Sequence, residues 1–450
     1  MRSAISLVLI LGCSLTAAAR EEYRRDFQKT VPLAAGKTFR IDHKLGGITI
    51  RTQPGAQASI HALIRTSAGS AETARRLAES IQISVDSSAS GVSVRTTYPS
   101  NWNNVSYGVD YDITVPDTAP LDIRNRFGAV TVDDAHAGTF INNGNGPVRF
   151  SGGRGRVQIE NSFGNVEVRN NAGDVQIRGG NGSVIATLVT GAADITNSFG
   201  AIQVRDAARG VTIHSNNGTI EVTSAGGNTN IANSFGRVSV TDCKGDLFVQ
   251  NQNGEIQATG ISGAADLRNS FAAVRFSRIG KGLTVNSQNA SVTGDTVGGQ
   301  AVIETSFGNV DVHDIKGGAR VTAGNSGVRI ASVGGPVYAK TSFGGTTVTG
   351  ADGPVTVENG NGSVVLDVRS GRKCAPVALR TNFAPIRVTL PPGLGYNLTA
   401  QTSFGHIRSD FEVSVTGEIG HDALNGKLNG GGCELRLMNQ NGNIEILKGQ

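Results

Sequence analysis

Apolar and polar residues alternate in short runs along most of the chain, and the runs recur every nine residues. Each run holds two apolar residues one position apart, and Gly or Asn residues separate it from the next run. Alternation over four or five residues between turn residues predicts β-strands, and helical periodicity is missing here. One repeat unit therefore consists of two such runs, each forming a strand followed by a turn. Four consecutive runs are centred on Val130 and Val132, Thr139 and Ile141, Val148 and Phe150, and Val157 and Ile159.

A Phe and an Asn mark alternate units at one fixed position. The Phe recurs at every second unit, and an Asn falls one unit after each Phe. A unit of this size cannot bury its apolar face alone, but stacked copies can, so we expect an all-β fold, a parallel β-solenoid with about 18 residues and two short strands per coil. About 13 coils fit between residues 125 and 369, which makes a rod of roughly 60 Å at a strand spacing of about 4.8 Å. The first column is Phe127, Phe163, Phe199, Phe235, Phe271, Phe307 and Phe343, and the second is Asn145, Asn181, Asn217, Asn253, Asn289, Asn325 and Asn361.

The Phe column has two interpretations. In the favoured one, each ring tucks into the corner of its coil and closes one end of a thin core, because seven exposed rings are costly. In the other, the rings form an exposed row spaced by two coils, roughly 9–10 Å, which stacks on sugars or on an apolar partner. Polar residues two positions before the Phe are expected to bond the backbone at the corner. They include Asn161, Asn197, Asn233, Asn269, Thr305 and Thr341.

Residues 1–19 have the pattern of a secretory signal peptide. Arg2 is followed by an apolar core over residues 5–15 and by small residues at 17–19, so we expect cleavage after Ala19. The alternative is a lipoprotein box, because "LILGC" ends at Cys13, which would then carry a lipid anchor. No other apolar stretch approaches the ~20 residues of a transmembrane helix. The mature protein is therefore expected to be exported, as a periplasmic, outer-membrane-associated or extracellular protein.

The two ends of the chain are less regular than the middle. Residues 20–124 predict an irregular N-terminal β cap with one short helix near 71–80, for which Ser70 is the N-cap candidate. Residues 125–370 predict the regular solenoid. Residues 371–450 predict irregular C-terminal coils and a cap, because the intervals from Phe343 to Phe383 and from Phe383 to Phe404 both depart from the repeat.

Three cysteines remain after Cys13, and they show no zinc-binding spacing. In an oxidising compartment Cys374 and Cys433, both in the irregular C-terminal part, are the pair we expect to form a disulfide. The alternative is that these two and Cys243 are three small buried residues.

The repeated phrases "NGxIxV" and "SFGxVxV", the lead-in "YDITVP" and the tail "GKLNGGG" with "NGNIEI" resemble the bacterial putative-adhesin family of β-strand-repeat proteins. The resemblance covers most of residues 40–448. It implies a right-handed β-solenoid similar to head-domain adhesins, an exported location and an adhesive role. It implies no catalytic residues, because the shared motifs are turn and core residues.

Chemistry-bearing residues do not gather into a recognisable site. The outward acidic residues Glu167, Glu221, Glu255 and Asp311 do not align in pairs, whereas Asp206, Asp242 and Asp314 share a column that fits a turn. The best match to a calcium β-roll has Val184 where the liganding Asp belongs. The net charge of +5 comes without a Lys/Arg run, which disfavours nucleic acid as a partner. We therefore expect no catalytic, cofactor-binding or metal site.

These patterns lead to three functional hypotheses. The first is a non-enzymatic, adhesin-like binding or scaffolding protein at the cell envelope, whose partner is a surface glycan or an envelope protein. The second is a carbohydrate-active β-helix enzyme, a lyase or hydrolase with an unrecognised site. The third is an envelope assembly protein that stacks end to end through its terminal strands. The sequence leaves the oligomeric state open.

Overall fold

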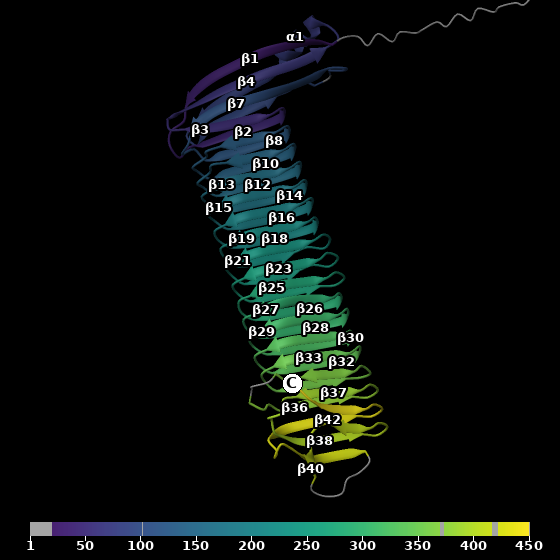
Figure 1. The fold of residues 1–450 in the computed structure, drawn as a ribbon. Helices are drawn as coiled ribbons and strands as arrows, with labels where there is room; N and C mark the ends of the chain where they lie inside the picture. Colours follow the sequence, from purple (N-terminus) through teal and green to yellow (C-terminus); the bar gives the residue numbers. More distant parts are fainter. Residues whose placement is uncertain (1–19, 101, 370–372, 416–421, 450) are drawn as a thin grey trace, which may run out of the picture.

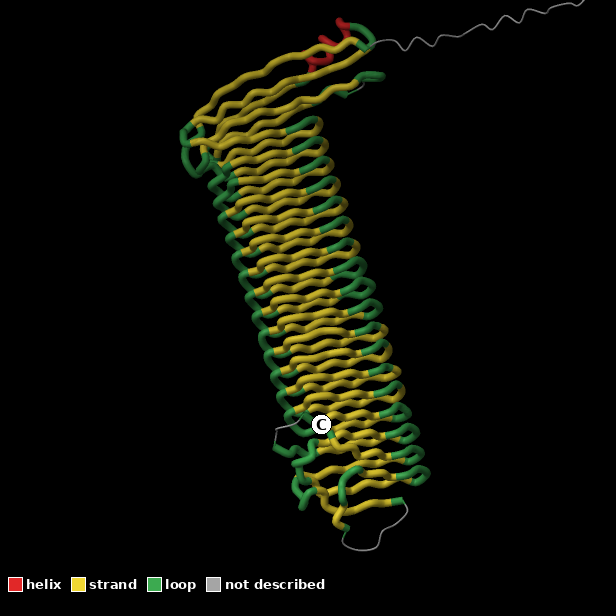
Figure 2. The backbone as a smooth tube through the Cα atoms, in the orientation of Figure 1, coloured by secondary structure: helices red, strands yellow, loops and turns green. Residues whose placement is uncertain are grey.

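The computed structural model describes residues 20–100, 102–369, 373–415 and 422–449. It shows a long rod of stacked coils, with strands on its two faces and turns along both edges (Figure 2). The β-solenoid predicted from the repeat is confirmed, because Val166 pairs in parallel with Val184, and Val184 pairs in turn with Ile202, one repeat unit further on. The expected signal segment 1–19, including Cys13, lies outside the described residues.

Each regular coil contributes one strand to each of two sheets (Figure 1). The first sheet contains β1 (Glu21–Pro32), β3 (Ile48–Gln53), β4 (Gln57–Ala68), β7 (Ser106–Pro116), β9 (Val130–Asp133), β11 (Val148–Ser151), β13 (Val166–Asn171), β15 (Val184–Val189), β17 (Ile202–Ala207), β19 (Ile220–Ala225), β21 (Val238–Cys243), β23 (Ile256–Ile261), β25 (Val274–Ile279), β27 (Val292–Val297), β29 (Val310–Ile315), β31 (Val328–Val333), β33 (Thr346–Ala351), β35 (Val364–Asp367), β37 (Ile386–Leu390), β39 (Ile407–Ser409) and β43 (Ile444–Lys448).

The second sheet contains β2 (Thr38–Leu45), β5 (Gln82–Ser88), β6 (Gly91–Thr97), β8 (Leu121–Phe127), β10 (Thr139–Asn145), β12 (Val157–Phe163), β14 (Val175–Asn181), β16 (Ala193–Phe199), β18 (Val211–Asn217), β20 (Thr229–Ala232), β22 (Leu247–Gln250), β24 (Ala265–Asn269), β26 (Leu283–Asn289), β28 (Ala301–Phe307), β30 (Ala319–Asn325), β32 (Val337–Phe343), β34 (Val355–Asn359), β36 (Val377–Thr381), β38 (Tyr396–Thr402), β40 (Val413–Ser414), β41 (Ala423–Leu428) and β42 (Cys433–Asn439).

The core is one continuous apolar layer between the two sheets. Val166 and Val168 of β13 point inward and are buried, while Glu167 between them and Arg169 after them face solvent. The same slots carry Val, Ile, Ala or Phe in the neighbouring coils, and β-branched side chains pack well in such stacked rows. The alternating pattern of the sequence is therefore the in–out pattern of the strands.

The coil that comes first in the chain is not the first coil of the stack. Strands β2 and β3 pair in parallel with β8 and β9 on one side and with β6 and β7 on the other. Residues 38–53, expected to belong to an irregular cap, therefore form a regular coil clamped between two later segments. The cap itself is made by the antiparallel strands β1, β4 and β7 and by the β5–β6 hairpin.

The single helix of the described residues, α1 (Ala71–Ser80), covers the cap sheet (Figure 1). It begins where the sequence predicts, since the Ser70 side chain accepts a hydrogen bond from the backbone N–H of Thr73 at 3.2 Å. Leu77 and two alanines of the helix are buried against β1 and β4. No helix in the described part of the chain is long and apolar enough to cross a bilayer.

The C-terminal end repeats the same topology. The last strands of the chain, β42 and β43, lie between the coil of β36 and β37 and the coil of β38 and β39. A disulfide joins Cys374, just before β36, to Cys433 at the start of β42, with 5.8 Å between their Cα atoms. This is the pair expected from the sequence, while Cys243 is buried and free. The chain therefore locks its last coil inside the stack.

Candidate binding edge

One edge of the solenoid carries a file of exposed aromatic rings, which we call the Phe edge. Its Phe side chains are between 42% and 77% exposed, so the favoured expectation that the rings tuck into the corners is wrong. Two further residues from the irregular C-terminal part extend the file. Its members are Phe127, Phe163, Phe199, Phe235, Phe271, Phe307, Phe343, Phe383 and Phe404.

The rings are exposed because the corner of each coil is already full. In the coil of β12, the buried Asn161 side chain donates to the carbonyl oxygens of Gly146 (3.2 Å) and Gly164 (2.7 Å). Gly164 has a φ of +117°, and a Cβ there would stand 2.4 Å from the Gly146 carbonyl oxygen. Amide and tight turn together leave no room for a ring inside, so Phe163 projects outward.

The backbone bonds expected for the corner residues are present. The Asn233 and Asn269 side chains and the hydroxyls of Thr305 and Thr341 each donate to a carbonyl oxygen of the following turn. Because these side chains add hydrogen bonds to the carbonyl oxygens of the turn, this buried polar column holds the geometry of the Phe edge.

Replacing Asn197 by Ala is expected to lower the free energy of unfolding by about 1–2 kcal/mol, because two carbonyl oxygens at the partly buried corner each lose a hydrogen bond. The Asn197 amide donates at 3.0 Å to both Gly182 and Phe199. Urea unfolding followed by circular dichroism measures the change. Asn216→Ala, an exposed residue of the same edge, is the control and is expected to unfold at the wild-type urea concentration; an equal loss in both variants would contradict the role of the corner.

Phe and Asn alternate along this edge in space as well as in sequence. Phe163 is paired with Asn145 on one side and with Asn181 on the other. Strand spacing then puts consecutive rings roughly 9–10 Å apart. The Asn side chains at these positions are exposed too: Asn145, Asn181, Asn217, Asn253, Asn289, Asn325, Asn361 and Asn441.

The alternation continues through the irregular C-terminal part. The backbone N–H of Asn441 donates to the Asn382 carbonyl at 2.8 Å, and that of Phe404 donates to the Gln440 carbonyl at 2.8 Å. Asn441 of the inserted last coil therefore lies between Phe383 and Phe404. The broken spacing in the sequence becomes regular spacing in the structure.

The Phe edge is poor in charge. The position just before each Phe or Asn holds Ser, Gly, Asn or Gln from residue 144 to residue 360, and six of these are serines. They are Ser162, Ser198, Ser234, Ser270, Ser306 and Ser342. Rings, amides and hydroxyls are thus the groups that this edge presents to a partner.

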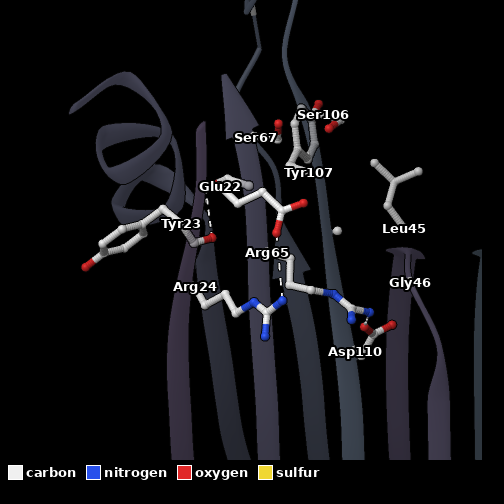
Figure 3. Close-up of a pocket in the computed structure, with 12 residues that line it drawn as sticks. Glu22, Tyr23, Arg24, Leu45, Gly46, Arg65, Ser67, Ser106, Tyr107 and Asp110 are labelled. Carbon is white, nitrogen blue, oxygen red and sulfur yellow. Dashed lines mark hydrogen bonds and ion pairs between the residues drawn. The ribbon is translucent and has the colours of Figure 1, made fainter. Parts of the chain in front are cut away.

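At the N-terminal end the Phe edge runs into a pocket. Leu45 is paired with Phe127, at the position that an Asn holds in the regular coils. Beside Leu45 the cap sheet projects beyond the coils, because β7 pairs with β4 from Ser106 onward but with β3 only from Tyr111 onward. The space of about 390 Å³ under this overhang is lined by Leu45, Tyr107 and polar residues (Figure 3). Arg65 pairs there with Asp110, and Arg24 with Glu22 at 3.7 Å.

A buried histidine, His43, lies at the same end of the molecule, and sequence reasoning did not single it out. His43 is enclosed by the rings of Tyr98 and Tyr111 and lies 3.1 Å from the Thr96 hydroxyl. Burial lowers the pKa of His43 to about 4, so the ring is neutral at neutral pH. Its alternating position in β2 is the one signal in the sequence that it faces inward.

Several acidic residues of the sheet face form ion pairs with arginines of their own or a neighbouring coil. Partial burial works to raise the pKa of Glu167, but hydrogen bonds from Arg169 and Arg149 outweigh it and hold the pKa below its usual value. Glu255 pairs likewise with Arg237 and Arg275. A general acid needs a raised pKa instead, so Glu167 does not suit that role.

The aspartate column is a turn feature, as expected. Asp206, Asp242 and Asp314 have φ values of +55°, +56° and +58°, the left-handed conformation that Asp tolerates better than most residues. Within the described residues no group of three or more His, Cys, Asp or Glu side chains is arranged to hold a metal ion.

No protein-family model matches the chain, and no curated protein matches it in sequence. Among solved structures, the crystal structure of "a putative cell adhesion protein" from Clostridium sporogenes is similar. It is 9% identical, with 95% of this chain and 100% of that chain covered and a TM-score of 0.17. At this distance the likeness carries no inference about function.

Proposed function

We propose that this protein is an exported, non-enzymatic binding protein of the cell envelope, adhesin-like in its action, and that the Phe edge is its contact surface. The observation that carries the proposal is the exposure of nine Phe rings in one file. Many large apolar side chains gathered along one edge of a protein surface are characteristic of an interaction site.

The solenoid adds rigidity and repetition to this edge. Each ring offers only a small contact, but a stiff array holds many equivalent contacts in line, so weak interactions sum to a tight one without new contacts. The disulfide between Cys374 and Cys433 agrees with an oxidising, extracytoplasmic location. The turn motifs that resemble those of the adhesin family agree with the same role.

End-to-end stacking is less well supported. At the N-terminal end the parallel stack meets antiparallel strands and a helix, and at the other end β41 pairs antiparallel to β38. Such caps cover strand edges that would otherwise add further strands.

The test replaces three central rings at once, Phe199, Phe235 and Phe271, by Ala. Retention of the purified protein on a glycan array and on isolated envelope fractions is expected to weaken by at least about 10-fold, because the loss interrupts the multivalent contact. The control replaces Phe140 and Phe248, aromatic residues of the sheet face, by Ala and is expected to bind like the wild type. Undiminished binding by the triple variant, or release of products from a polysaccharide, would contradict the proposal.

A further inference from the structure

We infer that the Phe edge binds an uncharged, extended β-1,4-linked glycan, with one disaccharide laid along every two coils. This rests on the proposed function, since it names the ligand class of the same edge. Three features of the edge support it: the spacing of the rings, the groups between them and the low charge.

The first support is the spacing. Rings recur at every second coil, roughly 9–10 Å apart. In an extended β-1,4 chain each sugar is turned over relative to the one before it, so the same face of the pyranose ring returns at every second sugar. The length of this two-sugar repeat is close to two strand spacings, ~10 Å. A file of rings with this period meets one apolar sugar face per disaccharide. An α-1,4 chain coils and presents no such straight row.

The second support is the chemistry between the rings. A pyranose has an apolar face of C–H groups, which packs on an aromatic ring, and an equatorial rim of hydroxyls, which needs donors and acceptors. Each exposed Asn between two rings supplies both, as an amide N–H₂ and a carbonyl oxygen, and the serines beside the rings supply hydroxyls. Phe163 with Asn145 and Asn181 is one such unit.

The third support is charge. Arginine and glutamate are placed on the sheet face, where they pair with each other, as Arg149 does with Glu167 at 3.0 Å. The positions just before the rings and amides are uncharged from residue 144 to residue 360, and the charge of Arg126 lies over the Phe127 ring at the N-terminal end of the edge. A polyanionic polysaccharide or a nucleic acid needs a row of cations, so the edge favours a neutral chain.

Unbroken alternation extends the site over the whole rod. Because the inserted coil places Asn441 between Phe383 and Phe404, the file keeps one phase to its C-terminal end. A second copy of this chain has the same period and is the competing occupant. Its signature is self-association through the edge in the absence of glycan.

The experiment measures binding of the full-length mature protein to cello-oligosaccharides and amorphous cellulose by calorimetry and pull-down, with amylose and heparin as the other arms. We expect affinity for the β-1,4 chains to rise with length in steps of two sugars, and no comparable binding to amylose or heparin. The triple variant of Phe199, Phe235 and Phe271 is expected to lose at least about 10-fold in affinity, and the Phe140 and Phe248 variant none.

Two deletions distinguish the spacing of the rings from the number of rings in the Phe edge. Removing residues 182–199 or residues 182–217 joins Asn181 to a turn Gly, at position 200 or 218, and each deletion removes one Phe of the file. The first deletion places two Asn coils next to each other and so shifts all later rings by one coil. The second deletion keeps the alternation of Phe and Asn coils. We expect the one-coil deletion to bind long chains several-fold more weakly than the two-coil deletion, with circular dichroism reporting that both fold.

Each other result overturns the inference and identifies an alternative. Equal binding to amylose, or equal affinity of the two deletion variants, would contradict the match of period. Preference for heparin would contradict the match of charge. Phe-dependent binding to an envelope protein but to no glycan keeps the proposed function and rejects this ligand. Phe-dependent dimers in sedimentation without glycan assign the edge to a second copy. If no binding of any kind depends on the Phe residues, both proposals are rejected.

Discussion

Replacing Leu437 by Asp is expected to unfold the C-terminal end of the solenoid while its centre stays folded. Leu437 lies in the inserted strand β42, fully buried, with Leu379 paired on one side and Ala400 on the other. A carboxylate placed there has no cation to pair with inside the core, which costs about 3 kcal/mol or more. In a stack whose coils contact only their neighbours, this loss is local.

Hydrogen exchange measured by mass spectrometry checks this result. Peptides of β36–β39, β42 and β43 are expected to exchange fast in Leu437→Asp and peptides of β14–β19 to remain protected. Arg436→Asp, one position earlier on the solvent face of the same strand, is the control and is expected to keep the wild-type protection. Protection of the C-terminal peptides in Leu437→Asp would show that the last coil does not hold this end together.

The second large effect is expected at the turn of the Phe edge. Gly200 has a φ of +114°, and a Cβ added there would lie 2.4 Å from the carbonyl oxygen of Gly182 in the preceding coil. Gly200→Val combines a conformation that a β-branched residue rarely adopts with a clash against backbone, so we expect a loss of about 2–4 kcal/mol in the free energy of unfolding. Urea unfolding measures it.

The matched control is Gly55→Val in the turn between β3 and β4. A Cβ at Gly55 meets no atom within 4 Å, so we expect its unfolding free energy to stay within about 0.5 kcal/mol of the wild type. Wild-type stability of Gly200→Val would mean that the turns do not stack closely, and the explanation for the exposed rings would fail with it.

The exposure of the Phe rings illustrates what a sequence pattern leaves open. Along β12 the inward positions are Val157, Ile159 and Asn161, and a simple count of two places Phe163 inward as well. The chain turns at that point, however, and the amide of Asn161 occupies the corner. Whether a residue at the end of a strand follows the inward row depends on which side chain fills the corner, and that is a property of the packed coil.

The ends of the rod depend even more on long-range contacts. Residues 38–53 stack on residues 121–133, and the last coil inserts between two earlier ones. No local pattern encodes which distant strand will be the neighbour, because every coil offers nearly the same pairing surface. The irregular spacing around Phe383 and Phe404 therefore looked like a loss of regularity, although the structure restores it with Asn441.

The sequence by itself determined the repeating coil, its two strands, the helix at 71–80 and the turn role of Asp206, Asp242 and Asp314. These are local properties, set by alternation, by glycine at left-handed or crowded turns and by helix capping. The tertiary structure alone decided the order of the terminal coils, the enclosure of His43 by two tyrosine rings and the outward direction of the nine rings. Those depend on which surfaces meet and on what space remains once the neighbouring coils have packed.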